Sequence, residues 1–204
     1  PDPEALPLFL HYGCIPSPRT VFCDTWKLPP GHFACWQDGV MTVTPYWQVP
    51  PAGTAADPPE QALERLHGLA AEAVRSRLVS DVPLGALLSG GIDSSLVAAL
   101  MQAAHPEPVR TFTIAFEAAG YNEAGWAARV ARHLGTRHTE FTVTAREARG
   151  VIARLPEIYD EPFADSSAIP TFLVSRLARG HVTVALSGDG GDEFFGGYER
   201  FRST

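Results

Sequence analysis

The residues best suited to do chemistry lie in one short stretch, Ser89 to Ser95, which reads SGGIDSS. An apolar run, Leu84 to Leu88, precedes it, and an apolar-periodic segment begins at Leu96. This order predicts a buried strand, a tight turn and the start of a helix. Adjacent glycines bring backbone N–H groups close to a ligand, and the helix adds the positive end of its dipole. The stretch therefore predicts an anion cradle, and phosphate is the anion that such cradles commonly hold.

Asp93 sets this stretch apart from the common phosphate loops, since no lysine follows the glycines and the glycines are adjacent. A carboxylate ~4 Å from a phosphate charge costs about 4 kcal/mol at an effective dielectric of 20, and a helix terminus returns only about 0.3–1 kcal/mol. A cation must therefore lie between them, and Mg2+ is the expected one. The alternative is a plain glycine turn in which Asp93, Ser94 or Ser95 caps the helix.

A second cluster, Ser187 to Tyr198, reads SGDGGDEFFGGY and combines five glycines with three carboxylates. Asp189, Asp192 and Glu193 offer hard oxygen ligands or hydrogen-bond acceptors. An acidic, solvated turn is the alternative, although the spacing does not match an EF-hand loop.

Strand and helix patterns alternate through the second part of the chain, which predicts an α/β fold with a mostly parallel sheet and flanking helices. The expected strands are 84–88, 110–116, 138–143 and 182–186, and the expected helices are 60–79, 94–104, 123–134, 145–155 and 167–179. Ligands of such sheets bind beyond the carboxyl ends of the strands. Ser89, the segment Ile114–Glu117 and Ser187 are therefore expected on one rim.

The first part of the chain has a different character. Residues 1–50 show little helical periodicity and three short β-like runs, Thr20–Phe22, His32–Trp36 and Met41–Thr44, the last two joined by a hairpin signal at 37–39. Residues 51–59 form a proline- and alanine-rich linker. We therefore expect a short β-rich segment over 1–50 and a separate domain over 60–204. Its first helix carries a stripe, including Leu63, Leu66 and Val74, that we expect to pack in the core.

Composition excludes several classes of protein. The 204 residues carry a formal net charge of −7 without a basic stripe, which argues against nucleic-acid and anionic-membrane partners. No apolar run approaches the ~20 residues of a membrane span, and the first residues do not resemble a signal peptide. Three cysteines without a CxxC pair indicate reduced thiols and a cytoplasmic protein. A start without methionine and an end just after a glycine-rich loop predict a fragment.

SGGIDSS resembles the pyrophosphate loop of the N-type ATP pyrophosphatases. Together with SGDGGDEFFGGY and DEPFADSSAIPT it resembles the synthetase domain of the glutamine-dependent asparagine synthetase family, and residues 1–50 resemble the tail of that family's class II glutaminase domain. The resemblance implies a fold like that of the adenine nucleotide alpha-hydrolases. No glutaminase residue carries over, because that nucleophile is an N-terminal cysteine and Cys14 is internal.

The resemblance also implies site residues and substrates. Asp93 and Asp192 would hold Mg2+–pyrophosphate, Asp189 would lie beside the acyl acceptor site, and the loop 159–167 would help to shape an aspartate pocket. The residues implied to bind ATP are Leu88, Ser89, Gly90, Gly91, Asp93, Ser94, Ser95, Ile114, Ser187 and Gly188. The family's catalytic lysine follows the second signature and is not in this chain, so the piece alone is expected to be inactive.

The implied reaction makes asparagine from aspartate, ATP and glutamine-derived ammonia, with release of AMP and pyrophosphate. A sibling amide-forming enzyme, such as a β-lactam synthetase, a peptide cyclase or a sugar or protein amidotransferase, is one alternative. A non-catalytic ATP-binding remnant is another. A homodimer is among the assemblies that the sequence leaves open.

Overall fold

The computed structural model describes residues 1–51, 53, 57–116 and 123–201. By its contacts the chain divides into two units, of which one contains residues 1–56 and 152–166 and the other 57–151 and 167–204. The sequence pattern indicates a single change of unit in the linker 51–59. The segment 152–166 differs from that expectation, since it lies with the N-terminal residues. Assignment of the two parts to glutaminase and synthetase domains stays a prediction.

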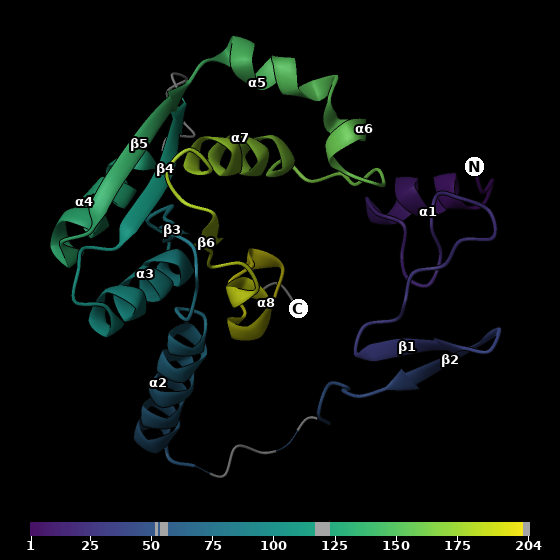
Figure 1. Cartoon of the computed structure of the whole chain (residues 1–204), viewed down its shortest axis with the longest axis horizontal. Coiled ribbons are helices and arrows are strands. Elements are labelled where there is room, and N and C mark those ends of the chain that lie inside the picture. The colour runs from purple at the N-terminus through teal and green to yellow at the C-terminus, as the bar shows by residue number, and fades with distance from the viewer. Residues whose placement is uncertain (52, 54–56, 117–122, 202–204) are drawn as a thin grey trace. The chain divides into compact units, whose positions relative to one another are not determined.

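A four-stranded sheet forms the centre of the second unit (Figure 1). Its order is β5-β4-β3-β6 and every neighbouring pair is parallel. The strands are β3 (Leu84–Leu87), β4 (Arg110–Phe116), β5 (Arg137–Val143) and β6 (Val184–Leu186). The predicted α/β fold with a parallel sheet is thus confirmed, although Glu117, at the expected end of the second strand, lies outside the described residues.

Helices cover both faces of this sheet. The helices that begin in this unit are α2 (Pro59–Ser76), α3 (Ile92–Ala104), α4 (Ala124–Leu134), α5 (Ala145–Ile152), α7 (Ala168–Ala178) and the short α8 (Gly191–Phe195), followed by a 3-10 turn at Glu199–Phe201, and α3, α4 and α7 contact the sheet. Leu88 packs with Ala98 of α3 and Ala127 of α4, whereas Phe112 packs with Ala178 of α7 on the other face. Because successive side chains of a strand point to opposite faces, the sheet separates two helical layers.

Three apolar positions do not pack as the stripes predict. On α2, Leu63 and Leu66 are 67% and 41% exposed, and only the end of that helix, around Val74, joins the core. Trp126 aligns in sequence with Val130 but is 60% exposed, whereas Val130 packs on the core. An apolar stripe predicts which face of a helix can pack against another element, but it does not predict whether such an element is present.

His138 on β5 is a half-buried histidine between two strands. Its Nδ1 lies 2.9 Å from Thr111 Oγ1 on β4, and its buried Nε2 has no hydrogen-bond partner among the described residues. Burial lowers the pKa of His138 below its usual value, and the charge of Glu140 opposes that shift. The neutral ring is therefore the form that the fold favours.

The N-terminal unit contains a hairpin and two short helices. The hairpin joins β1 (His32–Gln37) and β2 (Val40–Pro45) in antiparallel register, and the predicted turn is confirmed, with positive φ at both Asp38 and Gly39. The expected strand at Thr20–Phe22 is wrong, since only an isolated bridge between Arg19 and Trp26 forms nearby.

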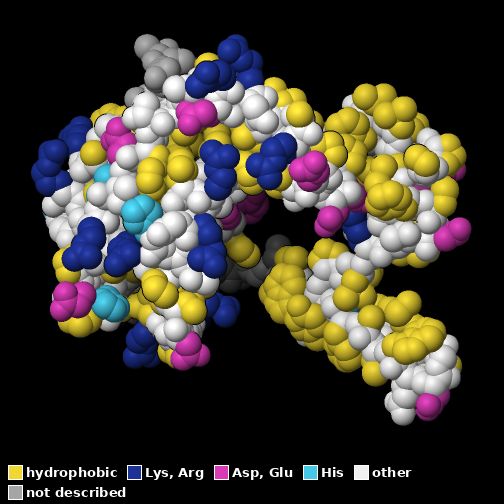
Figure 2. Space-filling model, turned by 45° about the horizontal axis from the view of Figure 1, so that its top comes forward, with side chains coloured by type: hydrophobic (Ala, Val, Ile, Leu, Met, Phe, Trp, Pro, Cys, Tyr) yellow, Lys and Arg dark blue, Asp and Glu magenta, His cyan; other side chains and the backbone are white. Residues whose placement is uncertain are grey.

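Helix α1 (Ala5–Tyr12) was not expected, because its residues are apolar on most sides and include Pro7. Proline in the first helical turn removes no helical hydrogen bond, and Gly13 ends the helix in a left-handed conformation. The second helix of this unit is α6 (Leu155–Ile158). Figure 2 shows hydrophobic side chains over much of the arm that contains the hairpin. None of the described helices combines the length and the apolar character needed to cross a bilayer.

Candidate functional site

The two glycine-rich motifs leave the sheet at the same edge. β3 and β6 are parallel neighbours, with Ala86 opposite Leu186, so their carboxyl ends lie side by side. The chain continues from β3 toward β4 and β5 on one side, whereas β6 lies on the other side. This is the kind of switch point at which open α/β sheets bind ligands.

The motifs touch through glycine backbone. A Cβ added at Gly188 would lie 2.6 Å from the amide nitrogen of Ser94 and 2.9 Å from the carbonyl carbon of Asp93. A Cβ added at Gly191 would collide with the carboxylate of Asp93. Residues with side chains cannot make these approaches without a shift of their neighbours. The fold therefore joins the two motifs into one site around Asp93.

Serine hydroxyl groups hold the first loop in shape. The buried Ser94 Oγ lies 2.9 Å from Ser89 Oγ, accepts the N–H of Ser89 at 3.3 Å and donates to the carbonyl of Gly91 at 3.3 Å. The N–H of Gly91 in turn donates to Ser89 Oγ at 3.2 Å. Both hydroxyl groups thus act within the loop and fix the direction of its backbone.

The first turn of α3 has exposed backbone at Gly91 and Ile92. The N-cap residue is Gly91, which has no side chain, and no side-chain hydrogen bond caps the helix. The first N–H groups of a helix lack partners within it, and they lie at the positive end of its dipole. The geometry therefore fits the predicted anion cradle.

Three residues that are predicted to bind ATP have buried or half-buried side chains. Leu88 is 1% exposed and packs in the core, so its side chain is not at the open edge. The hydroxyl of Ser95 is buried, without a hydrogen-bond partner among the described residues. Ile114 is half-buried near the end of β4. Their expected contacts with the nucleotide stay predictions, and the first two could act only through backbone groups or after rearrangement.

The carboxylates of the second motif differ in their contacts. Asp189 is exposed and accepts a hydrogen bond from Ser187 Oγ at 2.9 Å. Asp192 follows Gly191, the neighbour of Asp93, but its own carboxylate lies against Gly197. Among the described residues no three acidic, histidine or cysteine side chains form a group able to hold a metal. The pair formed by Asp93 and Asp192 stays the predicted Mg2+ site.

One contact of the first loop was not predicted. Gly90 has φ +88°, and an added Cβ would lie 2.7 Å from the Cβ of Trp126 in the first turn of α4. The guanidinium of Arg129 lies 4.7 Å from the centroid of the Trp126 ring. The signal for this neighbour was available, because a helix that follows β4 begins at the same sheet edge as the loop after β3.

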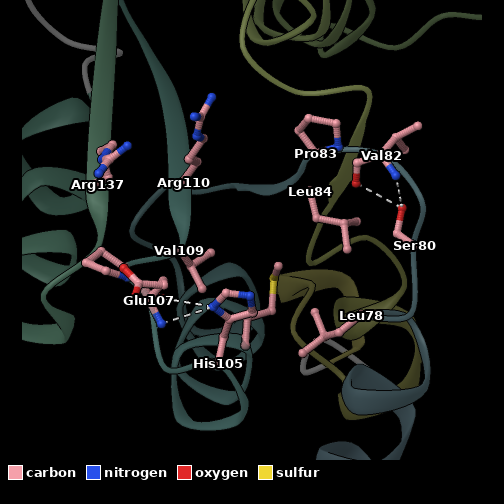
Figure 3. Close-up of a pocket in the computed structure, with 12 residues that line it drawn as sticks. Leu78, Ser80, Val82, Pro83, Leu84, His105, Glu107, Val109, Arg110 and Arg137 are labelled. Carbon is pink, nitrogen blue, oxygen red and sulfur yellow. Dashed lines mark hydrogen bonds between the residues drawn. The ribbon is translucent and has the colours of Figure 1, made fainter.

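A cavity of about 440 Å³ lies at the opposite, amino end of the strands (Figure 3). Its wall includes Leu78, His105, Arg110 and Arg137. Figure 3 shows the Arg110 side chain directed away from His105 and Leu78, and Arg110 donates to the carbonyl of His181 at 2.8 Å. None of the residues that the sequence singles out for chemistry lines this cavity, so the edge formed by β3 and β6 stays the candidate site.

The loop 159–165 lies in the N-terminal unit. Glu161 accepts the N–H of Val21 at 2.7 Å and forms an ion pair with Lys27, and the N–H of Ala164 donates to the carbonyl of Gly13 at 2.6 Å. Glu161 and Lys27 border a cavity of about 550 Å³ that Cys14 also lines. The expected part of this loop in an aspartate pocket stays a prediction.

Comparisons with known proteins agree with the motifs. The family model described as asparagine synthase matches residues 65–204. The chain is 34% identical over 204 residues to an asparagine synthetase [glutamine-hydrolyzing] of Bacillus subtilis, covering 98% of this chain and 32% of that protein. It is 38% identical over 198 residues to a putative asparagine synthetase of Methanocaldococcus jannaschii, covering 96% and 38%. The chain thus spans about a third of the length of these relatives.

Two solved structures share part of the fold. An NH3-dependent NAD synthetase from Campylobacter jejuni has a TM-score of 0.45 and 16% identity, covering 66% of this chain and 60% of that chain. A glutamine-dependent NAD+ synthetase from Acinetobacter baumannii has a TM-score of 0.49 and 21% identity, covering 76% and 30%.

Proposed function

We propose that this chain, which belongs to the asparagine synthase family, binds Mg·ATP at the edge where β3 and β6 end and is part of an enzyme that makes asparagine. The aspartate side-chain carboxylate would be adenylated with release of pyrophosphate, and glutamine-derived ammonia would then replace AMP. The contact of Gly188 and Gly191 with Asp93 carries the proposal, because it joins both signature motifs into one site.

The chemistry explains what the site has to supply. A carboxylate is a poor acyl donor, since its leaving group would be oxide, whereas an acyl adenylate releases AMP. Cleavage between the α- and β-phosphates depends mostly on positioning and on stabilising charge. The open first turn of α3 would orient the phosphates, and the serine hydrogen bonds would keep the loop in place before the nucleotide binds.

The carboxylates suit Mg2+ that arrives with the nucleotide. Magnesium in phosphate-transfer sites is held by one or two carboxylates together with substrate phosphates, so a pair of aspartates suffices. Asp93 and Asp192 are the residues that would hold it, and the bound ion would offset the negative charge of pyrophosphate.

Calorimetry of Mg·ATP binding to the chain tests the site. We expect wild type to bind, and Asp93→Asn to weaken binding about tenfold or more because one of two carboxylate ligands becomes neutral. Asp81→Asn, an exposed carboxylate after α2, is the matched control and should bind like wild type. Equal affinity of wild type and Asp93→Asn would reject the site.

The reaction itself is tested in the intact enzyme. With aspartate and glutamine supplied, AMP and pyrophosphate are the expected products, and release of ADP instead would reject the mechanism. A panel of other carboxylate substrates in the same pyrophosphate assay distinguishes asparagine formation from related amide-forming reactions on this scaffold.

A further inference from the structure

Trp126 lies beside the candidate phosphate loop, and Arg129 lies over its ring. The backbone and Cβ of Trp126 lie against Gly90, which has room for no side chain on that flank. Helical side chains tilt toward the N-terminus of their helix, and α4 begins at the carboxyl edge of the sheet. Trp126 is 60% exposed and lies in the first turn of that helix, beside the loop that contains Gly90.

The ring fixes the position of a cation. Arg129 follows Trp126 by three residues, so both lie on one side of α4, and its guanidinium lies 4.7 Å from the ring centroid. Stacking on an aromatic face restricts the many rotamers of an exposed arginine and leaves the edge of its guanidinium free to donate. An otherwise flexible charge is thereby held over the ring of Trp126, whose Cβ lies against Gly90.

The two motifs are acidic, so a cation beside them would help to bind a polyphosphate. The stretches 89–95 and 187–198 contain four carboxylates and no lysine or arginine. A polyphosphate at this edge meets that negative charge at close range, and a magnesium ion offsets only part of it. Arg129 is an exposed positive group on the ring of Trp126, and Trp126 contacts the loop at Gly90, whereas the acidic motif contacts it at Asp93 and Ser94.

We propose that Arg129, positioned by Trp126, contacts the polyphosphate of the nucleotide and contributes to binding pyrophosphate in particular. The inference rests on the proposed Mg·ATP site and adds to it a phosphate-binding side chain outside both motifs. Trp126 acts as a positioning residue, because it holds the guanidinium and does not itself need to touch the nucleotide.

Binding of Mg·ATP, Mg·pyrophosphate and adenosine to the chain tests this assignment by calorimetry. Arg129→Gln should lower the affinity for Mg·ATP and for Mg·pyrophosphate about three- to tenfold, because it removes one partly exposed charge-assisted contact. The affinity for adenosine should stay unchanged. Trp126→Leu should lower the affinity for both phosphate ligands by a smaller factor, and Arg129→Lys should keep part of the wild-type affinity for them. Arg132→Gln, an exposed arginine one turn farther from the edge, is the matched control.

The outcomes separate the inference from the function on which it rests. Unchanged phosphate affinity in Arg129→Gln, or an equal loss in Arg132→Gln, overturns the role of Arg129 while the Mg·ATP site stands. Absence of nucleotide binding to wild type, with its circular-dichroism spectrum folded, overturns both. A second variant, Arg129→Ala, gives the same reading should the glutamine variant fail to fold.

Discussion

Replacement of Gly188 by alanine tests the contact that makes one site of two motifs. The added methyl group would lie 2.6 Å from the Ser94 amide nitrogen and 2.9 Å from the Asp93 carbonyl carbon, whereas ordinary contacts begin at 3.4 Å. Both neighbours are backbone atoms, so they cannot rotate away and the two loops must separate by most of an ångström. Overpacking of this kind costs about 1–3 kcal/mol of unfolding free energy.

Thermal unfolding followed by far-ultraviolet circular dichroism measures this cost. For a chain of this size, about 1 kcal/mol shifts Tm by roughly 2–4 °C, so we expect a fall of about 2–12 °C. Gly68→Ala is the control, because nothing lies within 4 Å of its added Cβ, and within a helix this change should stabilise by about 0.5–1 kcal/mol. If Gly188→Ala were as stable as wild type, the two loops would not be in contact, and the reasoning behind the site would fail.

Three further predictions concern stability. Gly90→Ala should lower the free energy of unfolding more than Gly190→Ala. Both residues have positive φ and so share a backbone cost of about 1–2 kcal/mol, but only at Gly90 does the added methyl group meet nearby backbone. Urea denaturation of the two variants measures the difference. Burial lowers the pKa of His138, so as pH falls the unfolded chain takes up a proton at this histidine before the folded chain does. The free energy of unfolding should therefore be unaffected by this residue above about pH 6.5 and should decline as pH falls from there toward the folded pKa. His138→Gln should flatten that decline in urea midpoints, and an unchanged profile would contradict it. Glu161→Ala should cost about 1–3 kcal/mol, because it removes the acceptor of the Val21 N–H as well as an ion pair, and a Tm equal to that of wild type would argue against this role.

The sheet and its loops could be predicted because their signals are local. An apolar run followed by SGGIDSS predicts a strand, a turn and a helix, and the helix begins at Ile92, two residues before the expected start. The Gly39 turn could likewise be predicted, since positive φ selects glycine and its few substitutes.

The features that were missed depend on neighbours distant in sequence. The exposure of Leu63 depends on which elements pack against α2, and periodicity contains no such information. The contact of Gly90 with Trp126 arises from a crossing of two elements that lie 36 residues apart in sequence. Nor does the composition of the loop 159–165 indicate that its hydrogen bonds go to residues 13 and 21.

The return of residues 152–166 to the N-terminal unit has a consequence for how this protein can be divided. The backbone crosses from one unit to the other three times, after residues 56, 151 and 166. A single break at any of these three boundaries would therefore transfer an incomplete unit, because it would separate Glu161 from Lys27 or the strand β6 from β3. One crossover at a unit boundary cannot exchange either unit whole.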